Sequence, residues 1–133
     1  MDDLKISQLS FLGALFTLIV ISLGAWVRLT DAGLGCPDWP GCYGLLTTPD
    51  TADELAKAKE YYPDAVIDVG KAWREMLHRY MAGILGLYVF FITYISIKFS
   101  KRNYILPIVI SILIVIQAIM GMLTVTMLVK PTI

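Results

Sequence analysis

Three long runs of apolar residues constrain this chain more than any other feature. They cover residues 9–27, 80–97 and 104–129. At 1.5 Å per residue, the first run reaches about 28 Å, close to the hydrocarbon thickness of a bilayer. Because lipid offers no hydrogen-bond partner to the backbone, each run must be a helix or part of a closed barrel, and continuous runs lack the alternation of a barrel strand. The sequence therefore predicts an all-α integral membrane protein with three transmembrane helices.

Composition agrees with a membrane setting and argues against one class of partner. Hydrophobic residues make up 57% of the 133 residues, above the roughly 45–50% of a typical soluble domain. The 11 basic and 11 acidic residues cancel, and they are spread over the segments between the apolar runs rather than gathered into a basic face. We therefore expect membrane lipid as the surroundings and no nucleic-acid partner.

The polar segment 28–79 is expected to carry structure of its own. Thr51 and Glu54 have the spacing of a capping box, which predicts a short helix from Thr51 towards Tyr61 that stops before Pro63. Asp68 is a candidate cap for the second long helix, which would then begin outside the membrane.

The only two cysteines, Cys36 and Cys42, lie in this segment and are separated by prolines and glycine. Such residues favour turns that can join the two sulfurs, so a disulfide is the favoured prediction, structural or redox-active. Unpaired thiols and a metal site remain alternatives.

Disulfides persist in oxidising compartments, which places loop 28–79 in the periplasm. Link 98–103 has three basic residues and is expected in the cytoplasm. No transit peptide or cleavage site is evident, so we expect a multi-pass protein of the bacterial inner membrane.

Glu75 and His78 are the candidate chemical residues of the second helix, since residues three apart share one helix face. A neutral imidazole can ligate haem iron, and a nearby carboxylate can orient a ligand or move protons. Two other readings stay open at this point. His78 can be an interfacial histidine with Glu75 paired to Arg79, and a Glu-x-x-His pair also occurs at carboxylate–metal sites.

Two further polar residues belong to the apolar runs or their ends. Arg28 ends the first run, where it either extends to the interface or meets a haem propionate. Gln117 lies inside the third run, with Gly121 and Thr124 on its face. A buried amide needs a partner in lipid, so this face is expected to meet protein or, alternatively, a cofactor.

Together these residues resemble the amino-terminal half of haem A synthases. The resemblance runs from about residue 22 to residue 131, with 47–70 variable. Its four motifs are Gly24-Ala-Trp-Val-Arg28-Leu-Thr-Asp-Ala-Gly33, Cys36-Pro-Asp-Trp-Pro-Gly-Cys42, Glu75-Met-Leu-His78-Arg79-Tyr80-Met-Ala-Gly83 and Gln117-Ala-Ile-Met-Gly121-Met-Leu-Thr124-Val-Thr126.

The resemblance implies an eight-helix, two-repeat bundle in which each four-helix half can hold a haem between two histidines. Such enzymes oxidise a methyl group of haem O to the formyl group of haem A for cytochrome oxidase, with a haem b as electron-transfer cofactor. It implies that His78 is an axial ligand of haem iron and that Glu75 is the catalytic acidic residue. It also implies that Cys36 and Cys42 form the outward cysteine pair. Haem O synthase and cytochrome oxidase assembly factors are the partners it suggests.

The chain departs from that pattern in length. It has one histidine and three apolar runs, so residues 1–133 are expected to be an incomplete four-helix half-module, a fragment that is inactive alone without the carboxyl-terminal half. Two alternatives remain. One is a non-catalytic haem-binding or assembly subunit of a respiratory complex, and the other is a membrane thiol-exchange protein using Cys36 and Cys42.

Overall fold

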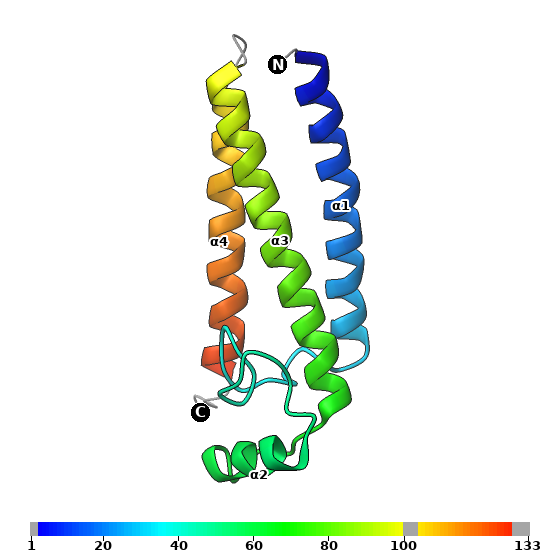
Figure 1. Ribbon diagram of the computed structural model, residues 1–133, viewed down its shortest axis with the longest axis vertical. Coiled ribbons are helices and arrows are strands. Elements are labelled where there is room, and N and C mark those ends of the chain that lie inside the picture. The colour runs from blue at the N-terminus through cyan, green and yellow to red at the C-terminus, as the bar shows by residue number, and fades with distance from the viewer. Residues whose placement is uncertain (1–2, 100–103, 129–133) are drawn as a thin grey trace.

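The computed structural model describes residues 3–99 and 104–128, which fold into four helices. They are α1 (Asp3–Leu29), α2 (Ala52–Tyr61), α3 (Val69–Phe99) and α4 (Ile105–Leu128). Figure 1 shows α3 between α1 and α4, with α2 and the long loop gathered at one end of these three helices. Within these ranges the only β-type pairing is an isolated bridge between Cys42 and Leu45. The predicted all-α class is confirmed.

Three of the four helices are long and apolar enough to cross a membrane: Leu4–Leu29, Val69–Phe99 and Ile105–Met127. The prediction of three spans is therefore confirmed. Helix α3 is longer than its apolar run because polar turns precede residue 80. This start was predicted from Asp68 as the cap. The Asp68 carboxylate accepts a hydrogen bond from the Lys71 N–H at 3.0 Å. Residues 100–103 of the predicted cytoplasmic link, and residue 129 of the third run, lie outside the described residues.

Helix α3 is the central element of the three long helices. Both α1 and α4 pack against it, and in the described ranges they do not pack against each other. Tyr88 of α3 donates a hydrogen bond to the Leu9 carbonyl of α1 at 2.9 Å. On the other side the Thr93 and Ser111 hydroxyls lie 2.8 Å apart, buried between α3 and α4. Hydrogen bonds of this kind hold transmembrane helices together where hydrophobic burial cannot.

The long loop forms a small core of its own against the first turns of α3. The buried members of this loop core are Cys36, Cys42, Tyr43, Ala58, Ala72 and Met76. Tyr62 packs edge-on against Tyr43, with 5.7 Å between ring centroids. The loop is thus an ordered layer that fixes the start of α3, and through it the side chains that α3 carries.

The predicted capping box of α2 is confirmed. The Glu54 N–H donates to the Thr51 hydroxyl, and the Glu54 carboxylate accepts from the Thr51 N–H at 3.1 Å. The helix ends at Tyr61, before Pro63, as expected.

Acid is expected to loosen the first turn of α2. The hydrogen bond from the Thr51 hydroxyl, followed by those from backbone N–H groups, lowers the pKa of Glu54 below its ordinary value of 4.5. A lowered folded-state pKa means that the stabilisation is present above about pH 4.5 and is lost as the pH falls through the folded-state pKa. Hydrogen exchange of the amides at 54 and 55, corrected for intrinsic rates at pH 6 and pH 3, measures the loss. Glu54→Gln keeps an acceptor but does not titrate, so equal acid loosening in that variant contradicts the assignment.

Candidate functional site

Cys36 and Cys42 are joined by a disulfide, as predicted, with an S–S distance of 2.03 Å. Both cysteines are completely buried. The segment they close, residues 36–42, is called the cysteine loop below. Inside it the Asp38 carboxylate accepts hydrogen bonds from the N–H groups of Tyr43 and Gly44, two residues with positive φ. Because this carboxylate satisfies those N–H groups, the turn after the disulfide has a defined shape.

The cysteine loop is docked on α3 through a close backbone contact. A Cβ on Gly35 would lie 2.6 Å from the Lys71 carbonyl carbon and 2.7 Å from the Ala72 nitrogen. Ala72 is itself completely buried. Only a residue without a side chain lets the chain approach α3 this closely, so Gly35 sets the position of Cys36 relative to the helix.

Glu75 faces the cysteine loop from α3 and is 4% exposed. Its Oε2 accepts a hydrogen bond from the Cys36 N–H at 3.0 Å, and its Oε1 accepts one from Arg79 Nη2. The Glu75–Arg79 pair, which the sequence offered as an alternative reading, is therefore present. A buried carboxylate with a charged partner and a backbone donor is held in one orientation.

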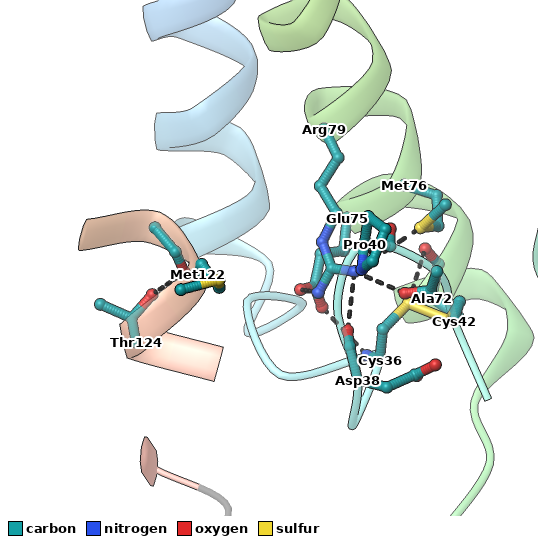
Figure 2. Close-up of polar contacts among 12 residues, drawn as sticks. Cys36, Asp38, Pro40, Cys42, Ala72, Glu75, Met76, Arg79, Met122 and Thr124 are labelled. Carbon is teal, nitrogen blue, oxygen red and sulfur yellow. Dashed lines mark hydrogen bonds and ion pairs between the residues drawn. A yellow bond between two sulfur atoms is a disulfide. The ribbon is translucent and has the colours of Figure 1, made fainter. Parts of the chain in front are cut away.

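The sequence analysis named Arg79 only as a possible partner of Glu75 and missed its contacts with the cysteine loop. Its Nη1 donates to the carbonyl oxygens of Asp38 at 2.9 Å and Gly41 at 2.6 Å. Figure 2 shows the guanidinium reaching from α3 into the cysteine loop, beside Glu75. The sequence shows only a cation one turn after Glu75, because the carbonyl groups that it binds belong to any residue type.

His78 packs against the backbone of α1 rather than joining Glu75 at the loop. A Cβ on Gly24 would lie 2.8 Å from its Cε1 and 3.2 Å from its Nε2. Its Nδ1 is buried and has no hydrogen-bond partner among the described residues. An orphaned buried nitrogen is uncommon and calls for an explanation. The signal in the sequence was Gly24, a glycine within an apolar helix, which can mark close packing.

A cleft of about 320 Å³ adjoins Gly24. Its lining residues are Gly24, Val27, Arg28, Asp31, Gly33, Leu34 and Thr124. Arg28 is thus placed on the wall of a cleft between the end of α1 and α4. Gln117 does not belong to this lining and is exposed, so the protein partner expected for its face stays a prediction.

One exposed ion pair ties the turn after α1 to the start of α3. Lys71 Nζ lies 2.9 Å from Asp31 Oδ2, and this hydrogen bond and its charge lower the pKa of Asp31 below its ordinary value. Such an exposed pair contributes little to stability. Asp31 lies outside the cysteine loop, whereas the carbonyl groups that Arg79 binds lie inside it.

The predicted site residues thus fall into two groups at one end of the molecule. Glu75, Cys36 and Cys42 form one group with Arg79, within the loop core. His78 and Arg28 form the other along α1, the first packed on Gly24 and the second on the cleft that Gly24 helps to line. The structure brings all five to the same end of α3 and α1, without a described contact between Glu75 and His78.

Comparisons with known proteins agree on one family. The family model described as cytochrome oxidase assembly protein matches residues 7–133. A heme A synthase of Shewanella oneidensis is 51% identical over 116 residues, which are 87% of this chain and 35% of that protein. A heme A synthase of Lysinibacillus sphaericus is 32% identical over 114 residues, 84% of this chain and 32% of the relative.

The chain therefore spans about a third of the length of these relatives. No solved structure matches it significantly. Because the family model covers nearly all of the chain and both relatives match most of it, the chain belongs to the cytochrome oxidase assembly protein family.

Proposed function

We propose that residues 1–133 are the amino-terminal half-module of a haem A synthase, which oxidises a methyl group of haem O to the formyl group of haem A. The relatives named heme A synthase support this proposal, with 51% identity for the one from Shewanella oneidensis. They also support a larger protein, since this chain spans only a third of their length. A carboxyl-terminal half would then supply the second histidine and the rest of the bundle.

The observation that carries the proposal is the state of His78. Its Nδ1 is buried and has no hydrogen-bond partner within residues 3–99 and 104–128, and its ring lies along Gly24, where no side chain separates it from α1. An imidazole in this setting suits a ligand that arrives from outside the described residues. Haem iron accepts a neutral imidazole as an axial ligand, so the residues present fit a haem, either haem O as substrate or haem b as cofactor.

Arg28 is proposed to bind a haem propionate. It lines a cleft to which Gly24 also contributes, and Gly24 is the residue of α1 on which His78 packs. The guanidinium fork suits a carboxylate through two parallel hydrogen bonds. Thr124 of α4 lines the same cleft, which gives the cleft a polar group on its opposite wall.

Glu75 is the proposed catalytic residue. Conversion of a methyl to a formyl group consumes one water and releases four protons and four electrons, so a group that accepts protons is needed near the reacting carbon. Haem, when bound, supplies the redox chemistry that side chains cannot. The Glu75 carboxylate has a fixed orientation and spare acceptor capacity beyond its bonds to Cys36 and Arg79.

The membrane setting is proposed to be the bacterial inner membrane, with loop 28–79 in the periplasm and link 98–103 in the cytoplasm. The Cys36–Cys42 disulfide supports this sidedness because disulfides persist in oxidising compartments. Haem O synthase, which would supply the substrate, and cytochrome oxidase assembly factors are the proposed partners.

The thiol-exchange alternative has less support. Both cysteines are completely buried, whereas exchange requires an attacking thiolate to reach a sulfur atom. A non-catalytic haem-binding subunit would use the same His78 site and is separated from the enzyme by the experiment below.

The test is to express the complete reading frame in cells that accumulate haem O and to measure haem A in pigment extracts. We expect haem A with the unchanged sequence and a loss of about 100-fold or more with Glu75→Ala, the low end of the effect of a general acid–base group. Haem bound without conversion would favour the non-catalytic subunit. Unchanged conversion by Glu75→Ala would contradict the assignment of Glu75.

A further inference from the structure

We propose that Arg79 is a positioning residue that locks the disulfide-closed cysteine loop and the Glu75 carboxylate into one unit, so that the redox state of Cys36–Cys42 controls the placement of Glu75. The inference rests on the proposed function for its meaning in catalysis. Its physical content, a coupling between a disulfide and a buried ion pair, is independent of haem.

The first support is where Arg79 binds. The carbonyl groups of Asp38 and Gly41 both lie between the two cysteines, inside the ring that the disulfide closes. Figure 2 shows the guanidinium, the disulfide and Glu75 within one small cluster. One side chain of α3 therefore holds the interior of the ring, with hydrogen bonds that use its charged, planar fork.

The second support is that Glu75 binds both Arg79 and the ring that Arg79 holds. Its Oε1 binds Arg79, and its Oε2 binds the N–H of Cys36, the first residue of the ring. The side chains of Arg79 and Glu75 are only 12% and 6% exposed. Loss of one partner would leave a buried charge uncompensated, which is costly, so the ring and the ion pair depend on each other.

The third support is the burial of the disulfide. Both cysteines are completely buried, with Met76 and Ala72 of α3 in the same core. A reductant reaches the sulfur atoms only when the loop moves off α3, and Arg79 is the side chain that binds the loop interior. Two-electron reduction by a dithiol would give two cysteine thiols and oxidise the donor to its disulfide. It would also release the ring that orients Glu75.

The coupling predicts how the disulfide equilibrium responds to substitution. Contacts made to the closed ring favour the disulfide, so their loss favours the dithiol. For Arg79→Gln we expect a shift of about tenfold or more towards the dithiol in equilibrium with dithiothreitol, which corresponds to about 30 mV for this two-electron couple. Arg79→Lys keeps the charge but loses the fork, and is expected to shift by less than the glutamine variant but measurably.

The experiment equilibrates the complete protein in membranes with dithiothreitol buffers, traps thiols by alkylation, and quantifies the Cys36 and Cys42 peptides by mass spectrometry. Lys71→Gln is the matched control. It removes a cation of the same helix that also reaches towards the loop, but at Asp31, outside the ring. Its equilibrium is expected to stay within twofold of the unchanged protein.

A double-mutant cycle with Glu75→Gln separates coupling from general loosening of the fold. If Arg79 and Glu75 act as one unit, the double variant shifts no further than Arg79→Gln alone. The proposal is overturned if the shifts are additive or if Arg79→Gln shifts the equilibrium by less than twofold. It is also overturned if Arg79→Lys is indistinguishable from the unchanged protein or if Lys71→Gln shifts the equilibrium as much as Arg79→Gln. If no haem A forms but Arg79→Gln still shifts the disulfide equilibrium, the result contradicts the proposed function and supports this coupling.

Discussion

Replacing Gly35 with alanine is expected to loosen the packing of the long loop on α3. The added Cβ would fall 2.6–2.8 Å from backbone atoms of Lys71 and Ala72, and backbone atoms of a helix cannot rotate away as a side chain can. Overpacking costs about 1–3 kcal/mol when side chains can adjust, so about 2 kcal/mol or more is expected here. That corresponds to about 30-fold more frequent opening of the loop.

Tryptic cleavage after Lys57 and Lys59 measures this opening, because both lysines lie in α2, whose Ala58 is part of the loop core. Cleavage of a transiently opened segment follows the opening equilibrium when reclosing is fast. Gly33→Ala is the matched control, two residues away, since a Cβ there meets nothing within 4 Å. Equal cleavage rates in the two variants would contradict the close contact of Gly35 with α3.

The sequence predicted those parts of the structure that follow from local chemistry or from lipid as the solvent. Three apolar runs became α1, α3 and α4, since an unpaired backbone is not tolerated in hydrocarbon. The Thr51–Glu54 box and the Asp68 cap formed as their spacing predicted. The disulfide was favoured because only two cysteines exist and turn residues separate them.

What the sequence did not predict depends on backbone groups and on close approach between distant segments. The contacts of Arg79 with the cysteine loop involve carbonyls 41 and 38 residues earlier in the chain, and carbonyls carry no sequence signal. The roles of Gly35 and Gly24 need the three-dimensional packing of the loop and α1 on α3. The residues alone left the haem reading of His78 open beside two others, the resemblance to the family favoured it, and it remains a proposal.

Gly24→Ala is expected to reduce the haem content of the protein through His78. The new Cβ would lie 2.8 Å from Cε1 and 3.2 Å from Nε2 of the imidazole, so the ring must turn away from its position against α1. Substitutions that misorient a metal ligand without removing it typically weaken metal binding about 10–100-fold. A loss of that size is expected for Gly24→Ala, and loss of the site for His78→Ala, as measured by the haemochrome spectrum per mole of purified complete protein.

The expected loss of haem is opposite in direction to the effect of Gly24→Ala on the stability of helix α1. Alanine stabilises a helix interior by about 1 kcal/mol relative to glycine, so α1 itself gains from the change and a weaker helix cannot explain lost haem. Gly13→Ala is the matched control, because it also places a methyl group of α1 against an aromatic ring of α3, 3.0 Å from Tyr88 Cε1. If loosened packing between α1 and α3 were the cause, both variants would lose haem alike. If His78 binds iron, only Gly24→Ala loses haem. Full haem content in His78→Ala would contradict the assignment of His78 as a ligand.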